Sequence, residues 1–246
     1  MPKVSVNILT KNRAGLLRKA LQSIRAQSFK DYEVVLIDDG STDNTKEVEK
    51  EMADAGLSIN FVIHNQSLGI TLSREEALEK SQGEYIAILD DDDEWIKIDK
   101  LAKQVKFLDD HKDCVLVGGG IKLAGSGKRE VIKFRPETDL QIRKTMLLRN
   151  NFFTSTVMFR KASAILAGGF IKDSDDFAED YDLWLRLGKL GSMYNFQEPF
   201  ALYNPSNYNK ARKKAFLAKQ LRLVTREKAN YPYYLLSAAL LKLRLL

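Results

Sequence analysis

Three clusters of carboxylates are the residues of this 246-residue chain whose types and spacing could do chemistry. Asp38-Asp39 and residues 90–93 (DDDD) each follow an apolar run directly, and Asp175-Asp176 precede Glu179-Asp180. Carboxylates at strand ends can be solvated turn formers or helix caps. Four consecutive aspartates against a buried strand repel one another, however, and a divalent cation with hard oxygen ligands relieves that repulsion. The sequence therefore predicts an Mg²⁺ or Mn²⁺ site at residues 90–93.

Other site chemistries lack their residues. No G-x-x-x-x-G-K-[ST] or G-x-S-x-G pattern occurs, and residues 118–120 (GGG) fail the dinucleotide fingerprint because Leu123 stands in place of its third glycine. Neither histidine, His64 nor His111, lies near a nucleophile, so we expect both to be ordinary polar positions. The single cysteine, Cys114, excludes an internal disulfide and, with two histidines, does not complete a zinc site.

The elements that must position these carboxylates alternate between strand and helix in the first half. The expected strands are short, continuous apolar runs, which are typical of strands buried on both faces of a parallel sheet. The order predicts a doubly wound α/β sheet that binds ligands at the carboxyl ends of its strands. The expected strands are 4–9, 33–37, 59–63 and 85–89, and the expected helices contain Leu17 to Ile24, Val48 to Met52, and residues 73–81.

The pattern changes after Trp95. We expect residues 118–135 to be irregular or hairpin-like, and both halves to share one sheet because no disordered linker separates them. The remaining expected elements are a helix with Leu101, Val105 and Leu108, strands at 114–117, 152–159 and 193–203, a helix with Tyr181, Trp184 and Leu187, and helices from residue 207 onward.

Four motifs in order give the chain a resemblance to a known family. Residues 4–13 (VSVNILTKNR) and 34–43 (VVLIDDGSTD) resemble the amino-terminal half of family 2 glycosyltransferases. Residues 89–95 (LDDDDEW) are similar to the family's "LDxDDxW" version of the DXD motif. Residues 168–170 (GGF) and 178–187 (AEDYDLWLRL) are similar to its acceptor-side block.

The resemblance runs from about residue 3 to residue 203 and implies the GT-A fold, a Rossmann-like, mostly parallel mixed sheet flanked by helices. It further implies an inverting enzyme that uses a nucleotide sugar, with UDP as the default nucleotide, together with Mn²⁺ or Mg²⁺. We accordingly expect residues 1–95 to form the nucleotide-sugar-binding half and 96–205 the acceptor-binding half. Residues 206–246 would form a helical tail, basic at first and then apolar.

The same resemblance assigns roles to individual residues of the donor side. Asp39 matches the aspartate that binds the base, with Asp38 supporting the turn, and Asp90 matches the first DXD residue, near the ribose. Asp92 matches the metal ligand, with Asp93 beside it. The full expected nucleotide-contacting set is Thr10, Asn12, Arg13, Asp38, Asp39, Arg74, Asp90 and Asp91.

On the acceptor side, Asp180 matches the general base, and Glu179 and Gly169 belong to the same block. We expect Trp184 and Arg186, at helical spacing, to be structural. Many relatives carry an arginine and a histidine after the final strand, near the diphosphate. This chain has no histidine there, so Lys210 or Arg212 would supply the positive charge unless the metal does most of that work.

The positive charge of the chain is concentrated in its tail. Residues 210–246 hold ten basic residues against Glu227 alone, a net charge of +9, which leaves −3 of the total +6 on residues 1–209. Residues 233–246 are almost wholly apolar, and a helix of that length spans about 20 Å, short of a hydrocarbon core of about 30 Å. Charge and apolar surface together predict an anionic membrane surface as partner. The alternative is packing on the body or on a second copy as a homo-oligomer.

Two rival functions remain open at this stage. A nucleotidyltransferase would show a glycine-rich basic loop near its first strand, and residues 10–13 (TKNR) are not one. A non-catalytic nucleic-acid-binding protein could use the basic tail, but the acidic body would repel phosphate, so we expect no nucleic acid. The opening MPKVSVNILT resembles a strand, not a signal peptide, which predicts a cytoplasmic protein, attached to the inner face of the plasma membrane if the tail binds lipid.

Overall fold

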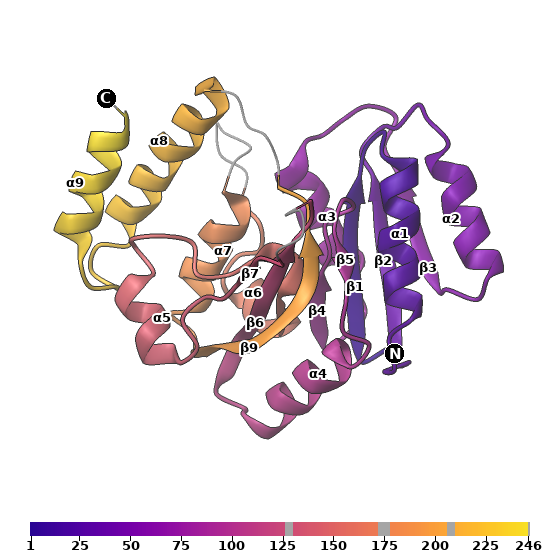
Figure 1. Cartoon of the computed structure of the whole chain (residues 1–246), viewed down its shortest axis with the longest axis horizontal. Helices are drawn as coiled ribbons and strands as arrows, with labels where there is room; N and C mark the ends of the chain where they lie inside the picture. Colours follow the sequence, from indigo (N-terminus) through magenta and orange to yellow (C-terminus); the bar gives the residue numbers. More distant parts are fainter. Residues whose placement is uncertain (126–129, 172–177, 206–209, 246) are drawn as a thin grey trace.

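A computed structural model describes the chain except for residues 126–129, 172–177, 206–209 and 246 (Figure 1). Asp175 and Asp176, the first part of the third acidic cluster, therefore lie outside the described residues. The side chains of residues 210–213, which include Lys210 and Arg212, lie outside them as well.

The first half forms four parallel strands joined by helices. Each strand is a short apolar run, and Val34 to Ile37 in the second strand are fully buried, as expected for a parallel sheet covered on both faces. The strands lie in the order β3-β2-β1-β4. The elements are β1 (Val4–Thr10), α1 (Ala14–Arg25), β2 (Tyr32–Asp38), α2 (Thr45–Asp54), β3 (Ile59–Ile63), α3 (Ile70–Lys80) and β4 (Tyr85–Ile88).

The second half continues the same sheet with mixed strand directions. The order runs on through β8, β6, β9 and β5, where β8 is antiparallel to its neighbours β4 and β6, and β9 is parallel to β6. A short strand, β7, pairs with β6 as a hairpin. The elements are β5 (Glu94–Trp95), α4 (Lys100–Asp110), β6 (Cys114–Leu123), β7 (Ile132–Lys133), α5 (Asp139–Thr145), β8 (Met158–Arg160), α6 (Lys161–Leu166), α7 (Glu179–Leu187) and β9 (Ser192–Tyr203).

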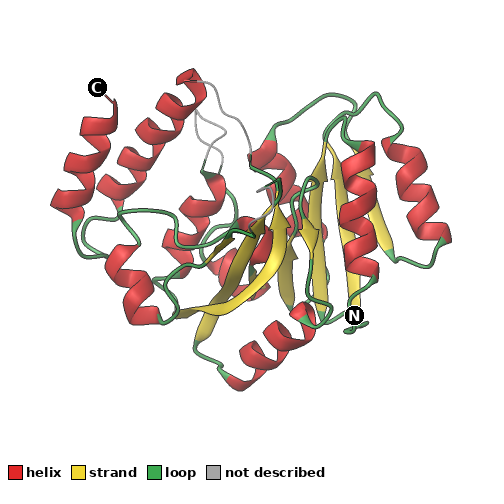
Figure 2. Cartoon of the chain, in the orientation of Figure 1, coloured by secondary structure: helices red, strands yellow, loops and turns green. Residues whose placement is uncertain are grey.

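Helices cover both faces of this sheet (Figure 2). Alternate side chains of β4 point to opposite faces: Tyr85 and Ala87 pack in the core under α1, α2 and α4, whereas Ile86 and Ile88 pack in the core under α3, α5 and α7. Trp184 of α7 is fully buried in the second core. The predicted α/β class, with its mostly parallel mixed sheet, is confirmed.

Residues 152–159 do not form the single strand that we expected. Thr154–Thr156 form a 3₁₀ turn, and the strand is confined to β8. The backbone N–H and the hydroxyl of Thr156 both donate to the carbonyl of Phe153, at 2.9 and 2.7 Å. Local bonding of this kind by Ser and Thr competes with strand pairing, so an alternating pattern was misleading here.

Strand β6 extends further than predicted, through the glycines to Leu123. The ring of Phe200 in β9 lies against Gly119, where an added Cβ would come within 2.3 Å of a ring carbon. The glycines therefore do not interrupt the strand: they make room for aromatic rings on its surface.

The tail is helical, as predicted. Helices α8 (Lys210–Arg226) and α9 (Tyr234–Leu245) pack together at the end of the molecule opposite α1 and α2 (Figure 1). One side of α9 faces inward with Ser237, Ala238 and Leu241 buried. Among the described residues, no helix combines the length and the apolar character needed to cross a bilayer.

Candidate active site

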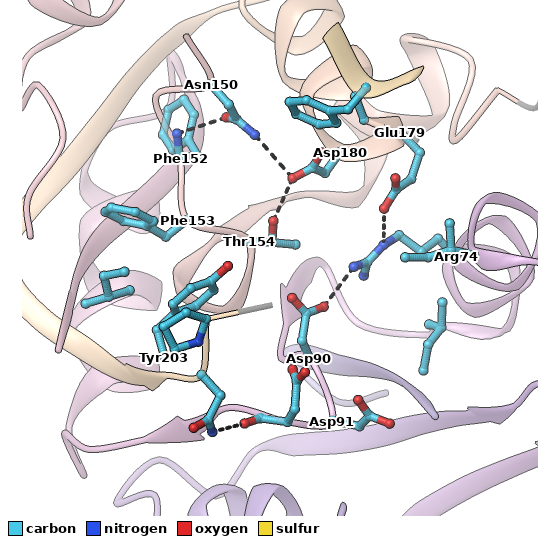
Figure 3. Close-up of a pocket in the computed structure, with 18 of the residues that line it drawn as sticks. Arg74, Asp90, Asp91, Asn150, Phe152, Phe153, Thr154, Glu179, Asp180 and Tyr203 are labelled. Atoms are coloured by element: carbon cyan, nitrogen blue, oxygen red, sulfur yellow. Dashed lines mark hydrogen bonds and ion pairs between the residues drawn. The ribbon is translucent and has the colours of Figure 1, made fainter. Parts of the chain in front are cut away.

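A cavity of about 1410 Å³ opens where strands of both halves end (Figure 3). Residues from β1, α3 and the loops after β2 and β4 form one wall, and residues from the segment before β8, the start of α7, the end of β9 and α8 form the other. Nine of the predicted site residues line it: Thr10, Arg13, Asp39, Arg74, Asp90, Asp91, Asp92, Glu179 and Asp180.

The loop after β4 alternates between exposed and buried carboxylates. Asp90 and Asp92 are partly exposed, whereas Asp91 and Asp93 are 4% and 1% exposed. Arg13 donates to Asp91 at 2.8 Å and to Asp92 at 3.0 Å. Burial raises the pKa of Asp92, and the negative charge of Asp90 raises it further, while Arg13 opposes both effects. A bound cation would be favoured at Asp92 for the same electrostatic reason.

The position of Asp93 differs from our expectation of a metal ligand. Its carboxylate does not line the cavity; it accepts hydrogen bonds from the hydroxyl of Ser155 and from the backbone N–H of Asn204, the latter at 2.8 Å. Burial and the neighbouring charge of Asp90 raise the pKa of Asp93 to about 8. Asp93 therefore fastens the loop to the segment before β8 and to the end of β9.

Arg74 joins the two walls of the cavity. Its guanidinium, 4% exposed, donates to Asp90 at 2.8 Å and to Glu179 at 2.9 Å (Figure 3). Burial and the charge of Asp180 raise the pKa of Glu179, and Arg74 partly offsets them. The family resemblance implies that Arg74 contacts the nucleotide; in the structure its guanidinium is held by two carboxylates.

Asp180 faces the cavity from the first turn of α7. Its Oδ2 accepts from the Thr154 hydroxyl at 2.6 Å and from the Asn150 amide at 3.2 Å (Figure 3). Ala178, in the left-handed conformation (φ +55°), takes the N-cap position of α7, so Asp180 is not the residue that caps this helix. Asn150 and Thr154 carry no sequence signal that singled them out beforehand.

The carboxylate of Asp39 is fully engaged by its surroundings. It accepts five hydrogen bonds, from the hydroxyls of Ser67 and Ser73, the backbone N–H groups of Leu68 and Gly69, and the His64 imidazole. Burial alone would raise the pKa of Asp39, but these donors hold the pKa below its usual value.

His64 was expected to be an ordinary polar residue, and that expectation was wrong. A usable signal exists: Asp38 pairs with Ile63 across β2 and β3, so the next residues, Asp39 and His64, leave the sheet side by side. The rule that parallel strands end at one edge of the sheet would have identified this pair.

Three other predicted residues do not line the cavity. Asp38 accepts from the Ser41 backbone N–H at 2.8 Å, which supports the turn. Asn12, at φ +54°, accepts from the Thr42 backbone N–H at 2.7 Å. Gly169 has φ +63° and lies against the Glu75 carboxylate, so it shapes the turn that follows α6 and does not line the cavity.

The donor set fits a hard divalent cation that is shared with a substrate. Within the described part of the chain, no three His, Cys, Asp or Glu side chains converge closely enough to hold a metal alone. Mg²⁺ is usually bound through one or two carboxylates plus substrate phosphates and water. Asp90 and Asp92, which both line the cavity, can supply such a pair of carboxylates.

Comparison with known proteins gives a family and several relatives. Residues 5–166 match the model described as "Glycosyl transferase family 2". A putative teichuronic acid biosynthesis glycosyltransferase, TuaG, of Bacillus subtilis is 29% identical over 228 residues, 92% of this chain and 88% of that protein. The GalNAc(5)-diNAcBac-PP-undecaprenol beta-1,3-glucosyltransferase of Campylobacter jejuni is 29% identical over 204 residues, 82% of this chain and 65% of that protein.

Solved structures share the fold. Staphylococcus aureus TarS 1–349 in complex with UDP-GlcNAc superposes with a TM-score of 0.74 at 20% identity, covering 94% of this chain and 68% of that one. The mannosyltransferase PcManGT of Pyrobaculum calidifontis, in complex with GDP-Man and Mn²⁺, gives a TM-score of 0.69 at 19% identity, covering 99% and 70%. The GT-A fold expected from the sequence is confirmed.

Removing the charge of Arg74 should destabilise the protein. Arg74→Ala leaves Glu179 buried without its counter-charge, and we expect the free energy of unfolding to fall by about 3 kcal/mol. Arg18→Ala is the control, because it breaks an ion pair with Glu51 in which both side chains are more than 40% exposed, and should cost less than about 1 kcal/mol. Urea denaturation at neutral pH measures the free energy of unfolding of both variants. If Arg74→Ala loses no more stability than Arg18→Ala, the structural role of Arg74 is contradicted.

Proposed function

The chain belongs to glycosyl transferase family 2 and is a glycosyltransferase, and from this premise we propose that it moves a sugar from a nucleoside-diphosphate sugar to a hydroxyl of a saccharide acceptor. The observation that carries the proposal is the single cavity lined by Asp90, Asp92 and Asp180 from opposite walls. Because the chain belongs to this family, we set aside both rival functions, the nucleotidyltransferase and the non-catalytic nucleic-acid-binding protein.

On the donor wall, Asp39 would bind the base, and Thr10, Arg13 and Asp91 would lie along the nucleotide, as predicted. A divalent cation, when bound, would be held by Asp92 with Asp90 and would neutralise the negative charge of the donor diphosphate. UDP is our proposed nucleotide: a structural neighbour was solved with UDP-GlcNAc, whereas another was solved with GDP-Man, so both bases belong in the test.

On the acceptor wall, we assign Asp180 as the general base of an inverting displacement. The acceptor hydroxyl attacks the anomeric carbon from the face opposite the diphosphate and gives its proton to Asp180, while the bond from the anomeric carbon to the diphosphate oxygen breaks and the nucleoside diphosphate leaves with its electron pair. Thr154 and Asn150 donate to one oxygen of that carboxylate and so fix its orientation. Proton transfer to a positioned base typically contributes a factor of about 10²–10⁴.

The proposed acceptor is a growing or lipid-linked saccharide. The two relatives are named for teichuronic acid biosynthesis and for a glucosyl transfer onto an undecaprenol-linked glycan. A cavity of about 1410 Å³ has room for more than the donor, and α8 contributes Ala215 and Phe216 to its wall. The acceptor therefore meets the enzyme next to its tail.

The outward side of α9 fits an anionic membrane surface. Leu235, Leu240 and Leu243 are 80%, 41% and 67% exposed, although the opposite side of the same helix is packed on the body. Lys242 and Arg244 are exposed beside them. A helix that is apolar on both sides and basic at its end combines the two signals of peripheral attachment. We propose that this side lies on the inner face of the plasma membrane, not on a second copy.

Nucleotide binding is the first test of the proposed function. UDP or GDP at about 100 times its Kd should stabilise the protein by about 2.7 kcal/mol, and we expect the larger rise in melting temperature with UDP and Mn²⁺. In Asp92→Asn the metal-dependent part of that rise should disappear while the unliganded melting temperature stays unchanged, since Asp92 is partly exposed. If the variant keeps the full metal-dependent rise, Asp92 is not the ligand.

Asp180→Asn should lower kcat by about 10²-fold or more with little change in donor affinity. Asparagine keeps the size of the side chain and can still accept from Thr154, so the fold should be retained. The measurement is kcat and melting temperature together, with Asp113→Asn, at an exposed residue just before β6, as the control. A loss of stability with kcat retained would mean that Asp180 is structural.

The membrane proposal is tested on the full chain. Leu235→Glu combined with Leu243→Glu should abolish flotation with anionic liposomes at low salt, because both charges enter the surface that would contact lipid. Leu166→Glu is the matched control, since Leu166 on α6 is 75% exposed. Flotation of the double variant equal to that of the control would show that α9 does not bind membrane.

A further inference from the structure

His64 lies between two carboxylates just behind the cavity. Its Nδ1 is 2.8 Å from Oδ1 of Asp39, and its Nε2 is 2.8 Å from Oε2 of Glu76 on α3. The His64 side chain is 7% exposed, so water does not replace either contact. Within the described part of the chain, Asp39 and Glu76 are the titratable groups that face the imidazole. The backbone N–H of His64 donates to the carbonyl of Asp38.

The two contacts decide the protonation state of the ring. A neutral imidazole has one N–H donor and one lone pair, so at one of the two carboxylates a lone pair would face a negative oxygen. A protonated imidazolium donates to both. Burial opposes the charge, but the hydrogen bonds and charges of Asp39 and Glu76 prevail and raise the pKa of His64. The positive ring thus holds Asp39 in place.

The number of bonds at Asp39 shows what the nucleotide would have to displace. A carboxylate offers about four lone-pair positions, and Asp39 already accepts five hydrogen bonds. The longest, 3.3 Å, comes from the hydroxyl of Ser73, and Ser73 and Asp39 both line the cavity. A donor N–H of the base can take the place of that hydroxyl, provided that the other four donors keep the carboxylate oriented.

We propose that His64, as a cation bridging Asp39 and Glu76, is a positioning residue for the base, so that nucleotide affinity depends on its protonation. The inference rests on the proposed function, because it takes Asp39 as the base-binding group. Loss of the proton turns the Nε2 lone pair toward Glu76 or the Nδ1 lone pair toward Asp39. Either change weakens the grip on the Asp39 carboxylate, so affinity falls as pH rises through the raised pKa.

The experiment measures the Kd for UDP with Mg²⁺ by calorimetry from about pH 6.5 to about pH 9. We expect wild-type affinity to fall by about tenfold, the loss that follows removal of one charge-assisted hydrogen bond. The control is His111→Gln: the other histidine, His111, is exposed and stacks on Phe107, away from the cavity. The affinity of this variant for UDP should show the same pH dependence as that of the wild type. Ionisation of the ligand is common to all variants and cancels in the comparison.

Two variants separate positioning from mere packing. Glu76→Gln supplies an amide that can donate to Nε2, so a neutral ring can serve both neighbours; affinity at the acidic end should be kept within about twofold and its pH dependence should flatten. His64→Gln should bind at every pH about tenfold more weakly than the wild type does at its acidic end, so that the two proteins converge at the basic end. NMR titration of the two histidine rings, assigned with His111→Gln, should give His64 a pKa above its ordinary 6.5.

The outcomes are distinct. A wild-type protein that binds UDP with the same affinity throughout, or a Glu76→Gln variant with the wild-type pH profile, overturns the role of His64 and leaves the proposed function standing. A His64 pKa below 6.5 overturns it as well. A wild-type protein that binds no nucleoside diphosphate at any pH overturns the proposed function together with this inference.

Discussion

One buried guanidinium holds the two halves of the site in register. Arg74 comes from a helix of the first half and bonds to Asp90 at the end of its last strand and to Glu179 at the start of α7, 105 residues further along the chain. A charge that is removed from water needs partners of good geometry. The planar guanidinium of Arg74 can donate hydrogen bonds in two directions, one to each carboxylate. Together with the bonds of Asp93 to Ser155 and Asn204, this side chain fastens the donor wall to the acceptor wall.

The same constraint explains the alternation within residues 90–93. Four adjacent aspartates cannot all point into one cavity without strong repulsion, so the chain buries two of them and gives each a partner. Asp91 is held by Arg13, and Asp93 by Ser155 and Asn204. Those bonds fix the backbone between them. Asp93 is thereby kept out of the cavity, whereas Asp90, Asp91 and Asp92 line it and are held by Arg74 and Arg13.

Much of the architecture follows from the sequence because each strand of the first half is a continuous apolar run that only a doubly covered sheet can bury. The carboxyl-end rule likewise brought Asp39, Asp90 and Arg13 to one edge. What the sequence could not show was the direction of individual side chains. Asp93 and Asp92 are equivalent in the motif, and only tertiary partners, one of them 111 residues away, decide that Asp93 faces inward. Local bonding by Thr156, in turn, overrode an alternating strand pattern at residues 152–159.

The place of β9 in the sheet has a consequence for the order in which a nascent chain becomes active. The strand inserts between β6 and β5, and Asn204, at its end, holds the DXD loop through Asp93. The strands of the first half can pair as they leave the ribosome, since domains tend to fold from the N-terminus during synthesis. The DXD loop, in contrast, acquires its last tether only after residue 204 has been translated. A partly synthesised chain therefore pairs the strands of its first half before the loop at residues 90–93 is fully held in place, and the cavity takes its final shape late in synthesis.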